Sequence, residues 1–329
     1  MMRLFLYHPS RLRLVVLAAS LAGCSAGTQT SIPSSVQSQA HVKAAVASPK
    51  VYIADERDSR VAVFSLNGAF VSQIQGSNTD LNEPVGIAVD SKGRIYVAQT
   101  NLDVFAPGAS GNVKPTITVS NAVRPAGLAI GAHNEIYAVG HAKASIVVYA
   151  QPITSSSKPV RKIVGSATQL KTPYGITVDS LGNLWVADSK AKSVLEFASD
   201  ANGDVAPIRV ITGSATTFDI PTDVQISAHG DIYVMDNHFN ANQVDIFSPD
   251  ASGNVAPAGT FQPQPTANWF RGEMRLYRKN LYVSENPLSG SLYALVSKYP
   301  VTDRGPVKPV RSIYVNPESY SLTAFVDIH

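Results

Sequence analysis

The sequence predicts an all-β protein, a six-bladed β-propeller of four-stranded blades, on three observations. A phrase made of an apolar run, a polar turn and a second apolar run around an aromatic residue recurs along the chain. The aromatic residues of successive copies are 44, 41, 48, 48 and 49 residues apart, the length of a four-stranded blade. The two ends of the region carry complementary halves of the phrase, and nothing after residue 50 sustains a helical period. The aromatic positions are Tyr52, Tyr96, Tyr137, Trp185, Tyr233 and Tyr282.

The fullest copy of the phrase is "PYGITVDSLGNLWVAD", which begins at Pro173. Its alternating residues predict a first strand over 175–178, and "DSLG" predicts a tight hairpin turn. A second strand is expected over 183–188, a third over 193–197 and a fourth in 207–213. Other copies begin at Pro84, Pro125, Pro221 and, in degenerate form, Phe270.

The ends of the repeat region predict how the ring closes. Residues 50–55, "KVYIAD", read as a second strand with no first strand before it. Residues 324–327, "AFVD", match the first strand "IAVD" of residues 87–90. The C-terminal strand is therefore expected to complete the N-terminal blade, which would remove the open sheet edges.

The Pro-x-Gly, Asp-x-x-Gly and Tyr/Trp-Val residues of these copies resemble the NHL-repeat six-bladed β-propellers over residues 50–329. The resemblance implies the fold. Related propellers include binding scaffolds, lactonases and lyases, so the function has to be argued from the site.

The N-terminus predicts a targeting segment. Three arginines and a short apolar run precede "LAGC", which resembles the lipobox of bacterial lipoproteins. The resemblance implies cleavage after residue 23 and lipidation of Cys24, the only cysteine. A plain secretory signal with an incidental cysteine is the alternative. We expect a signal peptide over 1–23, the lipidated Cys24 and a flexible tether over 24–49, and the propeller over 50–329.

The charge balance of the sequence limits the kinds of partner that are expected. Without the three arginines of the signal, 24 basic residues balance 24 acidic ones, so no nucleic-acid partner is expected. The expected partners are a membrane, through the lipid, and a protein, peptide or glycan. The protein is expected as a monomer in the bacterial cell envelope, not the cytoplasm.

We name the top rim the edge of the ring at which the first strand of each blade begins and its second strand ends. Two sets of equivalent positions, one residue from each blade, lie on this rim. Ten residues before each aromatic position stands a residue at the start of an innermost strand. The lactonases that the fold resembles hold a divalent metal there with several oxygen ligands. Here the ring has a single carboxylate, so neither a metal nor a cofactor is expected. Asp223 is a candidate ligand-binding residue, or a side chain bonded to nearby backbone at a turn. The ring contains Gly86, Gly127, Gly175, Asp223, Gly272 and Thr323.

The second ring is the end of each second strand. Its four carboxylates could bind a cation or a polyol, or could accept backbone N–H bonds within their own loops. The ring contains Asp55, Gln99, Gly140, Asp188, Asp236 and Glu285.

Further candidates lie in the top loops. His141 and His238 could meet across the ring, as histidines do in the lyases with similar propellers, or could be solvated loop residues. Trp269 begins the sixth blade beside an arginine, where it could contact a sugar or peptide or pack between blades.

The connections between third and fourth strands carry a second repeated phrase. "ASGNVKP", "ANGDVAP" and "ASGNVAP" begin at Ala109, Ala201 and Ala251. The "DANGD" of residues 200–204 is like the start of a calcium loop but lacks the closing glutamate, so a glycine-containing turn is expected instead.

Taken together, these residues favour a non-catalytic binding or scaffold protein that acts through its top rim. The alternative is a metal-dependent lactonase-like hydrolase or a lyase with its site at the mouth of the ring, and a third possibility is a structural array member with no small ligand.

Overall fold

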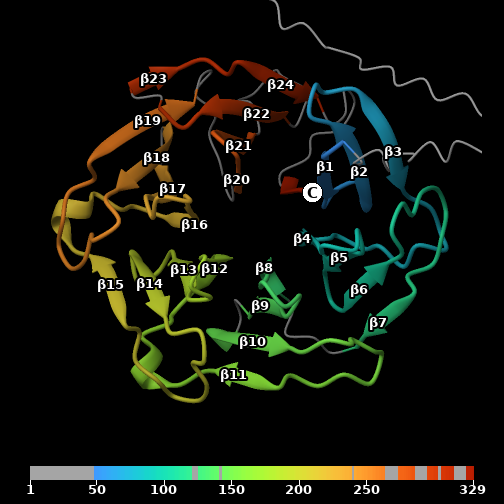
Figure 1. Ribbon diagram of the computed structural model, residues 1–329, viewed down its shortest axis with the longest axis horizontal. Coiled ribbons are helices and arrows are strands. Elements are labelled where there is room, and N and C mark those ends of the chain that lie inside the picture. The colour runs from blue at the N-terminus through green and yellow to red at the C-terminus, as the bar shows by residue number, and fades with distance from the viewer. Residues whose placement is uncertain are drawn as a thin grey trace, which may run out of the picture. The chain divides into compact units, whose positions relative to one another are not determined.

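A computed structural model shows six sheets arranged around an axis, which confirms the all-β six-bladed propeller (Figure 1). It describes residues 48–120, 125–140, 143–238, 241–263, 273–285, 295–302, 305–314 and 324–329. Residues 47–329 form one compact unit. Within the described part of the chain, no helix is long and apolar enough to cross a bilayer.

Each blade is an antiparallel sheet whose strands run outward from the axis in chain order, except in the first blade (Figure 1). Blade 1 contains β25 (Ala324–Ile328), β1 (Lys50–Asp55), β2 (Arg60–Ser65) and β3 (Phe70–Ile74). Blade 2 contains β4 (Gly86–Val89), β5 (Ile95–Ala98), β6 (Leu102–Phe105) and β7 (Ile117–Val119). Blade 3 contains β8 (Pro125–Ile130), β9 (Ile136–Gly140), β10 (Ser145–Tyr149) and β11 (Arg161–Ile163).

The other three blades complete the ring. Blade 4 contains β12 (Pro173–Val178), β13 (Leu184–Asp188), β14 (Ser193–Phe197) and β15 (Arg209–Thr212). Blade 5 contains β16 (Pro221–Ile226), β17 (Ile232–His238), β18 (Ala241–Phe247) and β19 (Gly259–Pro263), to which β23 (Gly305–Val307) adds in parallel. Blade 6 contains β20 (Met274–Tyr277), β21 (Asn280–Glu285), β22 (Leu295–Pro300) and β24 (Arg311–Tyr314). Short 3-10 turns, η2 (Ser166–Thr168) and η3 (Ser214–Thr216), follow β11 and β15.

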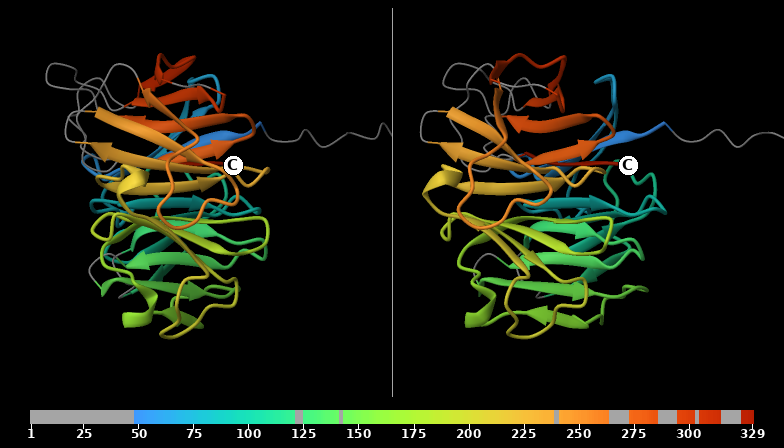
Figure 2. Two further views of the ribbon diagram at one scale, coloured as in Figure 1. Left: turned by 90° about the vertical axis from the view of Figure 1, so that its left-hand side faces the viewer. Right: turned by 60° about the vertical axis from the view of Figure 1, so that its left-hand side comes forward.

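The ring closes through β25, which pairs with β1 as the ends of the sequence predict. Figure 2 shows from the side that the red C-terminal segments and the blue first strands lie together at one part of the ring. The residue assignment within β25 was wrong by two positions. Asp327 pairs with Tyr52, so the residue equivalent to Gly86 is Phe325, not Thr323. No hairpin turn joins β25 to β1, so nothing in the local sequence fixes the register.

A one-residue correction applies to blade 6. Its first hairpin is one residue shorter than that of blade 5, since Leu276 pairs with Leu281 whereas Ile226 pairs with Ile232. The backbone N–H of Ser284 bonds to the carbonyl of Glu273 at 2.8 Å. Glu273, not Gly272, therefore stands at the position equivalent to Asp223.

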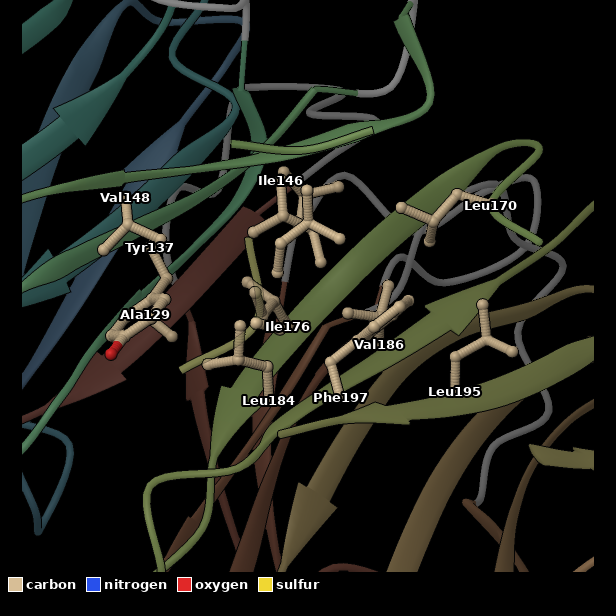
Figure 3. Close-up of a cluster of buried hydrophobic side chains, with 13 residues drawn as sticks. Ala129, Tyr137, Ile146, Val148, Leu170, Ile176, Leu184, Val186, Leu195 and Phe197 are labelled. Atoms are coloured by element: carbon tan, nitrogen blue, oxygen red, sulfur yellow. The ribbon is translucent and has the colours of Figure 1, made fainter. Parts of the chain in front are cut away.

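The hydrophobic core lies between neighbouring blades. Side chains of blades 3 and 4 meet face to face in one such layer (Figure 3). Val148 and Phe197 are fully buried there, and Tyr137 is almost so. Because strand residues alternate between the two faces of a sheet, each blade supplies one face to each neighbour. The same arrangement recurs around the ring, which places the inner strands close to the axis.

The hairpin turns tie the aromatic positions to the turn carboxylates at the bottom of the ring. Asp179 accepts bonds from the backbone N–H of Leu181 and Asn183, and from the indole N–H of Trp185 at 3.0 Å. In blade 2, Tyr96 donates to Asp90 at 3.1 Å. These carboxylates hold the turn and its aromatic residue, at the opposite end of the strand from the top rim.

Candidate functional site

The top rim is formed by the ends of strands that the pairing register brings together. In blade 4, Pro173 pairs with Asp188, Asp188 with Ser193, and Ser193 with Thr212. The loops that rise from this edge have different sequences in each blade, whereas the strands beneath them repeat. A rigid frame that carries variable loops is the usual setting for a binding site.

Asp188 is completely buried, and its carboxylate is bonded to backbone on two sides. It accepts the N–H of Lys171 at 2.6 Å and of Thr172 at 3.0 Å, both in the segment that leads into the blade. It also accepts the N–H of Ala191, in its own loop, at 2.9 Å. This bonding pattern is the one that the loop-holding interpretation predicts.

Asp236 repeats this pattern in blade 5 and adds a histidine. It accepts the N–H of Asp219 at 3.0 Å and of Ile220 at 2.8 Å. The Nε2 atom of His238 lies 2.9 Å from Asp236 Oδ2, and the imidazole is partly exposed. Burial raises the pKa of Asp236, while the two N–H bonds and His238 oppose this increase. These two candidate residues are therefore in contact.

A second buried carboxylate lies near this pair. Asp245 accepts a bond from Thr260 Oγ1 at 2.9 Å and from Gln243 Nε2 at 3.0 Å. Burial raises its pKa to about 6, and the neighbouring Asp236 acts in the same direction. Blade 5 thus brings together two buried acids and one partly exposed imidazole.

The other described rim positions are also bonded. Asp55 accepts from Arg60 Nε at 3.1 Å and from the N–H of Asp58 at 3.3 Å. Gln99 accepts the N–H of Asn82 and donates to Asp103 at 2.6 Å. Asp55 therefore bonds within the turn that follows its strand, and Gln99 bonds to the segment that leads into blade 2.

Asp223 does not sit in a turn. It lies in the inner strand β16, beside a register shift, and is 4% exposed. Oδ1 accepts the N–H of Val224 and Oδ2 the N–H of Met274 in the next blade, both at 2.8 Å. Burial raises its pKa to about 7, and the two N–H bonds and nearby Arg275 act in the opposite direction. The carboxylate joins blades 5 and 6 near the axis.

Sequence reasoning missed the other polar residues of the inner strands in blades 5, 6 and 1. Gln225, Arg275 and Asp327 occupy equivalent inner-strand positions, each paired with the aromatic residue of its blade. Arg275 Nε lies 2.9 Å from Asp327 Oδ1, and Asp327 Oδ2 accepts the N–H of Val89 at 2.6 Å. They were missed because two of them were misaligned with the other blades. The short first hairpin of blade 6 displaced Arg275 by one position, and the absence of a hairpin between β25 and β1 displaced Asp327 by two.

The charged inner positions lie in one half of the ring, and blade 4 carries Gly175 and the uncharged Thr177 at the same positions. Blades 5, 6 and 1 carry Asp223, Gln225, Arg275 and Asp327, whereas blades 2 and 3 carry glycine and alanine at these positions. At Gly127 a Cβ atom would lie 2.5 Å from the carbonyl oxygen of Tyr174 in the next inner strand. One half is therefore joined by close backbone contact, and the other by side chains that bond to backbone N–H groups of the next blade.

Three candidates lie wholly outside the described residues, and a fourth lies there in part. Cys24, His141 and Trp269 are not described, and neither is the side chain of Glu285, although its backbone ends β21. The contact between His141 and His238 therefore remains a prediction.

The expectation that the protein holds no metal is not tested by the described residues. No three His, Cys, Asp or Glu side chains among them are grouped as metal ligands. Each of the two Asp223 oxygens accepts one backbone N–H bond.

Comparison with known proteins supports the fold alone. No protein family matches the sequence, and no curated protein matches it. Among solved structures, a chain of the nidogen/laminin complex has a TM-score of 0.59 at 13% identity and covers 84% of this chain and 98% of its own. A Bacteroides caccae protein of unknown function has a TM-score of 0.58 at 11% identity, with coverage of 84% and 98%. A catalytically inactive variant of virginiamycin B lyase from Staphylococcus aureus, crystallised with quinupristin, has a TM-score of 0.51 at 13% identity, with coverage of 72% and 73%.

Proposed function

We propose that this protein is a lipid-anchored, non-catalytic binding protein of the bacterial cell envelope, which presents its top rim to a protein, peptide or glycan. The observation that carries the proposal is the bonding of the rim carboxylates. Asp188 and Asp236 hold the segments before their own blades through backbone N–H groups. Their oxygens fix the shape of the loops, and the loops are left to contact a partner.

The test compares the two ends of the ring in living cells. A benzophenone side chain is placed at Lys190, in an exposed top loop, and in a matched variant at Leu181, which is 79% exposed in a bottom turn. Irradiation is expected to give discrete adducts from position 190 and few from position 181. Equal labelling from both positions, or none from position 190, would reject the top rim as the binding face.

The proposed lipid anchor at Cys24 is tested in a separate experiment. Replacing Cys24 with Ser removes the thiol that the lipobox interpretation requires for acylation. The variant is expected to leave the membrane fraction and to lose incorporation of labelled palmitate. Retention of both would show that the N-terminus acts as a plain signal or a different anchor. The behaviour of the Cys24 variant does not bear on the top rim as a binding face, which the photocrosslinking experiment tests.

A second function is favoured by one contact, the 2.9 Å approach of His238 to Asp236. A carboxylate beside a partly exposed imidazole can hold the ring in one orientation, which suits a hydrolase or lyase. Simple γ- and δ-lactones serve as probes, with base uptake as the readout. Turnover that disappears in His238→Ala, with unchanged thermal unfolding, would favour the enzyme over the scaffold. Elemental analysis of the purified protein tests the metal-dependent form of this alternative.

A further inference from the structure

The outer edges of most blades are covered by the neighbouring blade. A glycine from the connection between the third and fourth strands of one blade lies against the outermost strand of the preceding blade. Gly111 covers β3, Gly203 covers β11 and Gly253 covers β15, each in a parallel bridge. In blade 5 the longer β23 does the same for β19. Gly111, Gly203 and Gly253 lie in the repeated segments "ASGNVKP", "ANGDVAP" and "ASGNVAP". The "DANGD" of residues 200–204 therefore forms part of an interblade contact.

The contact has a constant geometry, which we call the glycine latch. The N–H of Gly203 donates to the carbonyl of Lys162 at 2.8 Å, and its own carbonyl accepts the N–H of Val164 at 3.1 Å. Gly253 repeats both bonds on β15, at 2.7 and 3.1 Å. The φ angles of the latch glycines Gly111, Gly203 and Gly253 are 74°, 80° and 70°. L side chains rarely adopt this conformation, so glycine is strongly favoured at these positions.

The connection in blade 3 lacks this glycine. Counting back from Lys158-Pro159, which matches Lys114-Pro115, places Ser155 where Gly111 stands. The buried Ile153 takes the place of Ala109 in the interblade core, which supports the alignment. The blade 3 connection instead folds on itself, since the N–H of Ser157 bonds to the carbonyl of Thr154 at 3.0 Å. The edge of β7 is therefore not latched.

Two backbone groups on β7 stand where the latch bonds form elsewhere. Thr118 of β7 is equivalent to Lys162 of β11. Each of them directly precedes the buried residue of its strand, which is Val119 in β7 and Ile163 in β11. The carbonyl of Thr118 and the N–H of Ser120 have no hydrogen-bond partner among the described residues. Thr118 is partly exposed and Ser120 is exposed. An exposed strand edge with unpaired groups is a template for another strand.

We propose that the β7 edge of blade 2 is a docking site for an extended, glycine-containing segment of another protein, which adds in parallel as the internal latches do. Three glycine latches, and the parallel strand β23, show within the same ring the geometry that such an edge accepts. The ligand is recognised through its backbone, with glycine at the position of positive φ. The site lies on the outermost strand of blade 2 and does not depend on the function proposed above.

The direct test uses the chain's own latch as the probe. A fluorescent peptide with the sequence of residues 201–207, "ANGDVAP", is titrated with the full-length protein. The control peptide replaces Gly203 with Ala, which disfavours the required backbone conformation. The proposal expects saturable binding of the first peptide and binding at least about tenfold weaker for the second. Equal affinity for both peptides, or no binding of either, overturns it.

The matched control is a protein variant whose own blade 3 connection can pair with the β7 edge. Ser155→Gly with Ser156→Asn restores the Gly-Asn pair of residues 111–112 to the blade 3 connection. If that connection then latches onto β7, it competes with the peptide and weakens its binding by about tenfold or more. Unchanged affinity in a normally folded variant contradicts the assignment of the site.

Hydrogen exchange on the wild-type protein keeps the test independent of the variant's folding. The amide of Ser120 is expected to become protected when the peptide is added, with no change at Val164, whose N–H is already bonded to Gly203. Protection elsewhere but not at Ser120 rejects the site. Sedimentation tests the other occupant, because self-association that protects Ser120 without peptide would assign the edge to a second copy of this chain and overturn the proposal.

Discussion

Arg275 of blade 6 donates from Nε to Oδ1 of Asp327, at 2.9 Å, on the strand that closes the ring. The other oxygen of Asp327 accepts the N–H of Val89 in blade 2 at 2.6 Å. One buried carboxylate therefore joins the closing strand to the blades on both sides. The bonds lie near the axis, where the innermost strands have an unpaired edge.

Replacing Asp327 with Asn is expected to lower the free energy of unfolding by about 1–3 kcal/mol, because an amide cannot accept all three bonds made by the carboxylate. Urea unfolding measures the change. The control is Asp200→Asn, at an exposed carboxylate, which should change stability little. Equal effects of the two substitutions would show that the interblade bonds are not important for stability.

Gly175→Ala is expected to destabilise the protein because a Cβ atom would lie 2.8 Å from the carbonyl oxygen of Thr222 and 2.7 Å from Cα of Asp223. The predicted loss is about 1–3 kcal/mol. Gly86→Ala is the matched variant, since its nearest neighbour is the Ala98 side chain at 3.2 Å. Thermal unfolding of both should show the larger decrease for Gly175→Ala. The reverse order would contradict the close approach of blades 4 and 5.

The buried Asp223 predicts a pH dependence of stability. Burial raises its pKa from 3.8 to about 7, so the folded protein keeps a proton that the unfolded chain has lost between these values. Asp223 therefore favours folding most at low pH, and its contribution decreases as the pH rises through the range from 3.8 to about 7.

The measurement is urea unfolding of wild type and Asp223→Asn from pH 4 to pH 8. The difference in unfolding free energy between the two proteins should change by a few kcal/mol across this range, because every other titrating group is common to both. A constant difference would mean that folding does not change the pKa of Asp223.

Asp188→Ala tests the role of a rim carboxylate. The substitution leaves the N–H groups of Lys171, Thr172 and Ala191 without their acceptor, so a loss of about 2–4 kcal/mol is expected. The control is Lys190→Ala in the same loop, whose side chain is exposed. Native stability in Asp188→Ala would indicate that the carboxylate does not hold the loop.

Much of the architecture was predictable because it rests on repetition. The spacing of aromatic residues such as Tyr96 and Trp185 reflects the length of a blade, and the incomplete phrase at residues 50–55 predicted the closing strand. Each hairpin signal is local, so it can be recognised from neighbouring residues.

The inner polar cluster was only partly predictable. Asp223 was selected because it interrupts a column of glycines, but its bond to Met274 joins residues 51 positions apart in sequence. Asp327 was aligned with the turn residue Asp90, whereas its pairing with Tyr52 places it inside the ring. Register across the closing strand depends on packing between blades rather than on a turn.

The closing strand also sets the order of events during synthesis. Residues 324–328 leave the ribosome after every other strand of the ring, yet their partner β1 is the first strand to emerge. Until then the first blade has three strands, and the inner edge of β1, with the buried side chains of Val51 and Ile53 beside it, has no partner. A chain that lacks the closing strand would leave this edge unpaired, so a truncation shortly before residue 324 is expected to give an open, association-prone ring.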